Sequence, residues 1–426
     1  MSTIVGRLSL VILAVLPFER IPSWAIDRPV HATIRISQIL GLILITTSLT
    51  YVWKQRRILA QPYWLALALF NMVCILSFSL APDKLRSGSV VIYTLFVSVL
   101  AVVISVRLKL ANEKYVITAL LIGGGLACAF GYYQFFGDLA GLPTSLTGLR
   151  PQYSQPVFGF PRIQSTGLEP LYFGNFLLIP ASLLFYGFII RKWSLWVALP
   201  TLLLVIEVWL TLSRGAILAL CLEALLFLIV SVPAKSIRRG ICIVVLTGLG
   251  SLGATGLISY GTHHAVKKNF QSTHAVSNFS KQATNFSTGE SAIGRGETRD
   301  LAIRAWHEHP LVGIGPGEFG YYAHLHNPER YEDNHTIVNN EPFELLAETG
   351  ILGLLSFGSF VTLLLYTVVK SRLFSPEGYK SLRLPLLIGL MGILFQYLSF
   401  STLYITHLWI IFGLLAATTY KKSATE

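Results

Sequence analysis

The chain has 426 residues, of which 53% are hydrophobic and only 13% are charged, and its mean hydropathy is +0.61. Soluble domains carry about 25% charged residues, so this composition excludes a soluble globular protein and indicates an integral membrane protein. The net charge of +12 could suggest a nucleic-acid partner. However, much of that charge falls in short loops between apolar runs, and no nucleic-acid-binding module is visible.

Twelve apolar runs follow one another along the chain. We interpret each as a membrane-spanning helix, because about 20 apolar residues cross a hydrocarbon core of roughly 30 Å. The first run lacks the small-residue cleavage pattern of a signal peptide, so we expect it to be retained. The sequence thus predicts an all-α polytopic membrane protein with about 12 spans. Their approximate limits are 5–18, 33–53, 62–81, 87–106, 115–136, 170–190, 193–211, 214–232, 238–259, 346–369, 384–400 and 402–420.

The positions of Lys and Arg predict the orientation of these spans, since short cytoplasmic loops carry an excess of positive residues. More than half of the 33 basic residues fall in loops on one face. We therefore expect both termini in the cytoplasm. The basic segments are 54–57, 107–114, 191–192, 235–239, 370–383 and 421–422, together with Arg7.

Two long segments then lie on the outer face, residues 137–169 and residues 261–343. Only the second is large enough to fold, so we expect one large outer loop with short helices (260–343) between spans one to nine (1–259) and spans ten to twelve (344–426). The loop begins with a Ser-, Thr- and Asn-rich part that is typical of a flexible surface segment. After it, "ETRDLAIRAWHE" (297–308) predicts a short helix, and "HPLVGIGPGEFG" predicts a tight glycine turn.

Arg214, in "LTLSRGAIL", falls between two apolar spans in an outer turn of almost no length. An arginine at a helix end often extends to the membrane surface. A guanidinium also presents a two-pronged fork to phosphate oxygens and stays charged at any relevant pH. Because positive charge is disfavoured on the outer side, this position favours a phosphate ligand.

The outer loop contributes further arginines in "IGRGETRDLAIRAW", namely Arg295, Arg299 and Arg304. Arg295 and Arg299 are four residues apart and can share one face of a helix, with Glu297 and Asp300 beside them. They are candidates for the same anion site. A solvated helix with salt bridges along its surface explains them equally well.

The remaining motifs indicate architecture rather than cofactor chemistry. "GPGEFG" (315–320) matches GxGxxG but does not follow a strand, so a turn with positive φ explains it better than a dinucleotide site. The four cysteines fall inside apolar runs without CxxC spacing, which disfavours disulfides and thiolate metal sites. Because HExxH, Walker A, GxSxG and DxD patterns are missing from the outer loops, we expect neither a metal nor another cofactor.

Three motifs together resemble a known family. In chain order they are "LTLSRGAILAL", "GRGETRDLAIRAWHEHPLVGIGPGEFG" and "NNEPFELLAETGILGLL", with a long outer loop between the first and the last. Their order, spacing and shared outer face are similar to those of the O-antigen ligase and polymerase superfamily of bacterial membrane glycosyltransferases. The similarity covers roughly residues 168–355.

The resemblance implies a GT-C-type helical fold in the bacterial inner membrane, with the active site on the periplasmic or extracellular face. It implies inverting, metal-independent transfer of a glycan from a polyprenyl (undecaprenyl) diphosphate carrier to a hydroxyl of a glycan or lipid acceptor. A regulator of polysaccharide chain length is a further partner that it suggests. Carried over by motif, Arg214 and Arg295 would grip the diphosphate, with Arg299 as a nearby second candidate. Fixed guanidinium groups would stabilise the charge that develops on the diphosphate.

The chain departs from this family at Asn339 and Asn340, where the ligases have His-Asn and the histidine is the expected base or acceptor-orienting group. An amide cannot act as a general base near neutral pH. His335, four residues upstream, is a candidate replacement because histidine titrates near neutrality, and a purely structural hydrogen bond is an equal alternative. The carboxylates of Glu169, Glu341 and Glu348 are further candidates, and Glu348 could instead pair with an arginine.

Two alternatives stay open from the sequence. The missing histidine favours a polymerase, or a ligase with a non-lipopolysaccharide acceptor, over a ligase onto lipid A core. A bicarbonate or other small-solute permease is the alternative from another functional class. A carrier places its ionisable residues near the bilayer midplane on broken helices, whereas here they gather at the outer face, which favours the transferase.

Overall fold

The computed structural model describes residues 4–21, 23–26, 32–108, 112–264, 275–277, 279, 290–332, 334–371, 378 and 381–420. Within these ranges nearly all regular structure is helical, as the sequence predicts. The exception is a two-stranded antiparallel hairpin, β1 (Ser23–Ile26) with β2 (Ala32–Arg35), in which Ser23 pairs with Arg35. The hairpin was not predicted, and it delays the start of the second apolar helix from residue 33 to residue 36.

Each of the twelve predicted apolar runs coincides with an apolar helix. Seven of these helices are long and apolar enough to cross a membrane: α2 (Ile36–Lys54), α5 (Lys84–Leu108), α6 (Glu113–Leu139), α9 (Pro170–Ile189), α11 (Arg214–Ser231), α12 (Ile237–His264) and α16 (Glu341–Lys370). Five are shorter: α1 (Ile4–Val15), α4 (Pro62–Phe78), α10 (Ala198–Leu210, after the 3-10 turn η2, Leu195–Val197), α18 (Arg383–Gln396, continued by η4, Tyr397–Ser399) and α19 (Thr406–Thr419). The protein is therefore a polytopic membrane protein, and twelve remains the predicted number of spans.

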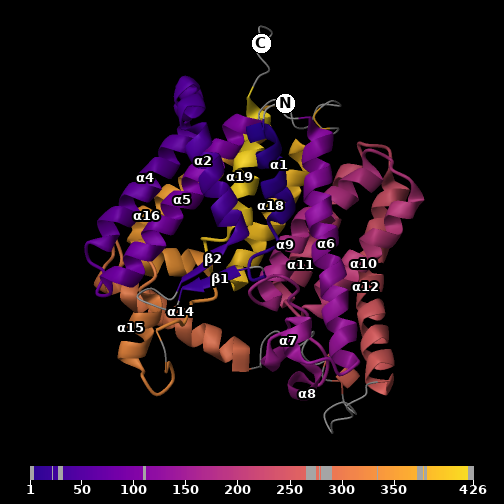
Figure 1. The fold of residues 1–426 in the computed structure, drawn as a ribbon. Coiled ribbons are helices and arrows are strands. Elements are labelled where there is room, and N and C mark those ends of the chain that lie inside the picture. Colours follow the sequence, from indigo (N-terminus) through magenta and orange to yellow (C-terminus); the bar gives the residue numbers. More distant parts are fainter. Residues whose placement is uncertain are drawn as a thin grey trace.

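The helices form a bundle with two different ends (Figure 1). The start of α1 and the end of α19 lie at one end, while the short helices of the two long connections lie at the other. Helix α9 is buried almost along its whole length and packs against α18, α10 and α11. Helix α16 packs against α4, and α19 packs against α5. A short helix, α3 (Arg56–Leu59), joins α2 to α4.

The two long connections predicted between spans contain the short helices at this second end of the bundle. Residues 140–169 contain α7 (Thr144–Thr147), η1 (Pro151–Tyr153) and α8 (Gln155–Phe158). The larger loop contains α14 (Glu290–Glu308) and α15 (Phe319–His326). The predicted helix at 297–308 is confirmed and begins earlier, at Glu290. Most of the Ser-, Thr- and Asn-rich part before it lies outside the described residues.

The predicted glycine turn is confirmed, and it interlocks with a break in α16. Gly313, Gly315 and Gly317 all have positive φ, as does Gly350 inside α16. Four backbone hydrogen bonds join the turn to the helix on both sides of Gly350: Ile314 N to Ala347 O (3.0 Å), Gly315 N to Glu348 O (3.0 Å), Ile351 N to Pro310 O (3.0 Å) and Leu352 N to Leu311 O (3.2 Å). The "HPLVGIGPG" and "AETGILG" segments therefore form one structural unit.

Candidate functional site

Arg214 lies at a sharp elbow between α10 and α11. Leu212 takes a positive φ of 49° there, and the Thr211 hydroxyl accepts a hydrogen bond from the Ser213 amide (3.1 Å). Ser213 is the N-cap residue of α11. A Cβ atom on Gly215 would overlap the Ser399 hydroxyl, so only glycine lets the elbow pack directly against η4. The elbow fixes the backbone of Arg214 at the first position of a membrane helix.

Arg295 of α14 lies close enough to Arg214 for their charges to interact. Burial, and then the positive charge of Arg214, lower the pKa of the Arg295 guanidinium below its usual value. Arg299 points elsewhere, since its side chain is 52% exposed and pairs with Asp300 at 3.4 Å. Arg304 is also exposed. The structure thus brings together Arg214 and Arg295, and it leaves Arg299 on the solvated surface of α14.

A third arginine, Arg162, joins this pair and was missed in the sequence. Its Nε donates to Thr211 O at the elbow (2.7 Å), and its guanidinium lies over the rings of Tyr153 and Phe158 at 5.4 and 5.7 Å. Burial lowers its pKa, and the charge of Arg214 acts in the same direction. The available signal was the one that identified Arg214, namely an arginine in a segment that is predicted to lie on the outer face, where positive charge is disfavoured.

Two more arginines surround this group. Arg150 forms an ion pair with Glu169 at 3.4 Å. Arg20 donates to Gly148 O at 2.6 Å, and burial followed by the charge of Arg150 lowers its pKa. Glu169 is therefore engaged with an arginine.

The arginine cluster, defined here as Arg162, Arg214 and Arg295, has a clear electrostatic consequence. Guanidinium groups remain protonated in proteins, so partial burial of three of them near one another leaves their charges mutually destabilising. An anion with several oxygens that binds between them would relieve this repulsion and offer acceptors for two-pronged hydrogen bonds. The cluster is therefore suited to phosphate-like or diphosphate-like groups.

Asn339 and Asn340 shape the backbone at the start of α16. Asn339 has a φ of 58°, and its backbone N–H donates to the Ser401 hydroxyl at 2.9 Å. Asn340 caps α16, since its Oδ1 accepts from the Phe343 amide (3.3 Å) while its Nδ2 donates to Leu398 O (2.8 Å). Both residues thus tie the start of α16 to the connection between α18 and α19.

The glutamates at the start of α16 are buried and hold irregular backbone. Glu341 accepts from the Thr402 amide (2.8 Å), and Glu344 accepts from the Val338 amide (2.8 Å) and the Ser401 hydroxyl (2.6 Å). One turn further, Glu348 accepts from the Phe319 amide (3.2 Å), at the end of the glycine turn. These contacts explain why carboxylates stand at the mouth of an apolar helix.

Arg86 of α5 supplies a positive charge to the same region. It donates to Asn334 O, and its charge acts on Glu344 and Glu348. An arginine partner for Glu348 was one alternative from the sequence, and Arg86 is the residue that the structure offers. His335, the candidate base, is exposed and directly follows Asn334, whose carbonyl packs against Gly320.

Two glutamates inside apolar helices were not identified as candidates from the sequence, although both stand within predicted apolar runs. Glu207 of α10 and Glu223 of α11 are fully buried. Glu207 lies against Gly131 and interacts with Cys128, while Glu223 lies against Gly392. Ionisable residues are therefore not confined to the segments that are predicted to lie outside. This finding weakens the argument from the sequence against a permease.

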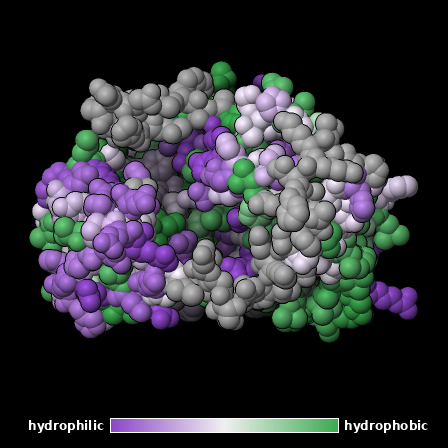
Figure 2. Space-filling view, turned by 90° about the horizontal axis from the view of Figure 1, so that it is seen from below, coloured by the Kyte–Doolittle hydropathy of each residue, from purple (hydrophilic) through white to green (hydrophobic). Residues whose placement is uncertain are grey.

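Figure 2 shows the face at the end that bears α14 and α15. Hydrophilic residues gather on the side of these two helices, and the surface beside them is hollowed, with further hydrophilic residues inside the hollow. Within the described ranges, no three His, Cys, Asp or Glu side chains lie close enough together to hold a metal ion.

Comparison with protein families gives one match. Residues 199–358 match the family model described as O-antigen ligase. This segment begins in α10 and ends inside α16, so it includes the elbow, α14, the glycine turn and the break at Gly350. A search of curated proteins found no match.

Proposed function

We propose, from the match of residues 199–358 to the O-antigen ligase family model, that this membrane protein transfers a glycan from a polyprenyl diphosphate carrier to an acceptor hydroxyl. Glycan transfer of the ligase or polymerase type, between lipid-linked and acceptor substrates in the membrane, is what the family itself indicates. The donor and the mechanism are our inference. The observation that carries them is the arginine cluster at the elbow between α10 and α11.

The cluster would bind the diphosphate of the donor. In the transfer, the acceptor oxygen forms a bond to the anomeric carbon while the bond from that carbon to the diphosphate breaks, and its electron pair stays on the diphosphate. Arg162, Arg214 and Arg295 would stabilise this negative charge as it develops. Three fixed guanidinium groups could do so without a metal ion, and attack from the face opposite the leaving group would invert the anomeric centre.

The proton of the acceptor hydroxyl needs a recipient. Asn339 cannot take it, because an amide is not a base near neutral pH. Glu341 and Glu348 accept hydrogen bonds from backbone amides, and Glu169 is paired with Arg150, so these carboxylates have structural partners already. His335 also has a contact of its own, but it is exposed, and we take it as the more accessible candidate base.

The orientation belongs to the same proposal. We place the termini in the cytoplasm and the arginine cluster on the periplasmic or extracellular face of the bacterial inner membrane. The positive-inside distribution of basic loops supports this, as does the position of α14 and α15 at the end of the bundle opposite the termini (Figure 1). A regulator of polysaccharide chain length would then act from the outer face.

Arginine variants test the proposal in cells. Arg162→Ala, Arg214→Ala and Arg295→Ala should each reduce the amount of long glycan by roughly a hundredfold, the loss typical for one group that stabilises developing charge. Arg299→Ala is the matched control on the same helix as Arg295 and should stay within about twofold of wild type, since an exposed ion pair contributes little. Glycan gels, with membrane protein levels measured in parallel, give the readout. Normal glycan from Arg214→Ala would refute the proposed role of the cluster.

A further inference from the structure

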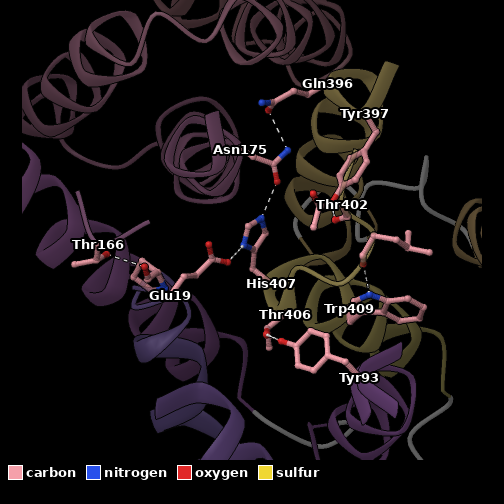
Figure 3. A network of polar contacts seen from close by, with 12 residues as sticks. Glu19, Tyr93, Thr166, Asn175, Gln396, Tyr397, Thr402, Thr406, His407 and Trp409 are labelled. Carbon is pink, nitrogen blue, oxygen red and sulfur yellow. Dashed lines mark hydrogen bonds and ion pairs between the residues drawn. The ribbon is translucent and has the colours of Figure 1, made fainter. Parts of the chain in front are cut away.

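A row of three buried polar side chains, which we call the amide row, connects α19, α9 and α18 (Figure 3). It consists of His407 of α19, Asn175 of α9 and Gln396, the last residue of α18. Each of these residues is at most 1% exposed. His407 Nε2 lies 2.7 Å from Asn175 Oδ1, and Asn175 Nδ2 lies 3.0 Å from Gln396 Oε1. The row therefore joins three helices through direct contacts between side chains.

The amide row ends at the elbow that carries Arg214. Gln396 Nε2 donates to Leu171 O at 3.2 Å and to the Ser213 hydroxyl at 3.4 Å. Ser213 is the N-cap residue directly before Arg214. Leu171 and Asn175 lie about one turn apart on α9, so Gln396 contacts a whole turn of that helix and the elbow at the same time.

The backbone of the elbow is packed closely between α9 and α18. A Cβ atom on Gly174 would lie 2.8 Å from Ala216 Cβ, and one on Gly215 would lie 3.1 Å from Gln396 Cγ. Glycine at these two positions therefore lets both helices touch the elbow directly, with no room for a further side chain. Because of this packing, the elbow can move little unless α9 or Gln396 moves with it.

The hydrogen bonds of the amide row run in one direction, toward the elbow. A carbonyl oxygen can only accept, so the Gln396 atom that contacts Leu171 O is the nitrogen, and the Gln396 oxygen accepts from Asn175 Nδ2. Asn175 Oδ1 then accepts from His407 Nε2. Each amide thus accepts from one neighbour and donates to the next, a combination that no apolar side chain of the same size provides.

The elbow fixes two of the three arginines of the cluster. Arg214 follows Ser213 in the chain, and Arg162 Nε donates to Thr211 O at 2.7 Å. Ser213 and Thr211 are themselves joined, since the Ser213 N–H donates to the Thr211 hydroxyl at 3.1 Å. A displacement of Ser213 would therefore shift both guanidinium groups relative to Arg295.

We propose that Asn175 and Gln396 position the Ser213–Arg214 elbow so that the arginine cluster binds a diphosphate. Both amides are buried, so they act through the elbow rather than on the anion, and His407 anchors Asn175 from α19. They are positioning residues, and the loss of either one weakens anion binding although it removes no charge. The diphosphate as ligand rests on the function proposed above.

Inorganic pyrophosphate is the probe that tests this role independently of glycan transfer. Its affinity for the purified full chain in lipid nanodiscs is measured by calorimetry at a single pH. Gln396→Met keeps the length of the side chain but loses its donor and its acceptor, and it should weaken binding about tenfold, the size expected for a lost buried hydrogen bond. Asn175→Leu acts one step further from the elbow and should weaken binding about threefold.

Asn71→Leu is the matched control for stability. Asn71 of α4 is also buried, and its Nδ2 donates to the hydroxyl of Ser98 of α5 at 3.1 Å, between two helices that do not form the elbow. This variant should lower the melting temperature about as much as Asn175→Leu does and keep the wild-type affinity for pyrophosphate. Weaker binding in the variants of the amide row is then an effect on the elbow and not on stability.

A double-variant cycle tests whether Gln396 acts through Ser213. Ser213→Ala removes only the last contact of the row and should weaken binding about threefold. Its combination with Gln396→Met should weaken binding no more than Gln396→Met alone, because that contact is already lost. Ser213→Ala also leaves the buried amides in place, so it tests the connection even if Gln396→Met and Asn175→Leu do not fold.

Several results would overturn the proposal. Wild-type affinity in Ser213→Ala or in folded Gln396→Met would remove the positioning role, as would losses that multiply in the double variant. An equal loss of affinity in Asn71→Leu would assign the effect to stability, and failure of the wild-type protein to bind pyrophosphate would remove the ligand. If wild type binds pyrophosphate with the expected variant pattern but transfers no glycan, the proposed function fails while the positioning role stands.

Discussion

Arg162, Arg214 and Arg295 come from three parts of the chain and meet where α10 turns into α11. Each is fixed by a different device: Arg162 by a bond to Thr211 O and two aromatic rings, Arg214 by the elbow, and Arg295 by α14. Because their backbones are fixed before a ligand arrives, little ordering energy has to be spent when an anion binds. This fixed geometry favours a role for the arginine cluster in binding the diphosphate that leaves during the transfer.

Sequence reasoning reached only part of this site. Arg214 and Arg295 stand in motifs that resemble those of the O-antigen ligase family, so the sequence alone identified them as candidates. Arg162 lies in a separate connecting segment, and its contact with Thr211 arises only when residues 49 positions apart in the chain fold together. The sequence also could not show that Asn340 serves as a helix cap and that the glutamates of α16 hold backbone amides.

One residue-scale prediction concerns Glu318, which lies before α15 and is buried. Burial, and then the charge of Asp83, raise its pKa from 4.5 to about 7. Between these two values the folded protein holds a proton that the unfolded chain releases, so stability should fall as the pH rises from about 4.5 to about 7 and then level off. Thermal unfolding of detergent-solubilised protein across this range checks the expectation. Glu318→Gln should show a smaller fall than wild type, and an identical fall in both would contradict the burial argument.

At the scale of elements, local hydrophobicity was enough to locate the helices. Each apolar run became a helix because a chain in a membrane must satisfy its backbone hydrogen bonds internally. The break in α16 was not predictable in the same way, since it depends on the glycine turn some 35 residues earlier in the chain, which supplies hydrogen bonds on both sides of Gly350. The hairpin of β1 and β2 was likewise missed, because its strands are only four residues long, which is too short for an alternating pattern to identify a strand.

The hydrogen bonds between the glycine turn and α16 on both sides of Gly350 predict that replacing this residue destabilises the protein. A Cβ atom there would overlap the Leu311 carbonyl, and the positive φ of 65° is strained for any other residue. Gly350→Ala should therefore destabilise the protein by roughly 1–3 kcal/mol, as is usual when a packed site is overfilled. Gly358→Ala is the matched control on the same helix, where a Cβ atom would meet no described atom within 4 Å. Melting temperatures in detergent compare the two variants, and equal values would show that the interlock contributes nothing.

At the scale of the whole molecule, the ends of the bundle differ in composition and in structure. The start of α1 and the end of α19 lie at one end, and α14 and the hollow beside it lie at the other (Figures 1 and 2). The segment that matches the family model supplies the elbow, α14 and the first part of α16, whereas Arg162 comes from outside residues 199–358. A fragment limited to that segment would therefore lack part of the arginine cluster.

Glycan transfer is tested most directly by incubating the purified full chain with a polyprenyl-diphosphate oligosaccharide and analysing the products by mass spectrometry. Longer lipid-linked glycan would identify a polymerase, and glycan on an added acceptor would identify a ligase. Wild-type protein should form one of these products, with release of the polyprenyl diphosphate, and Arg214→Ala should form about a hundredfold less. Neither product from folded wild-type protein supplied with donor and acceptor, or equal product from Arg214→Ala, would contradict this prediction.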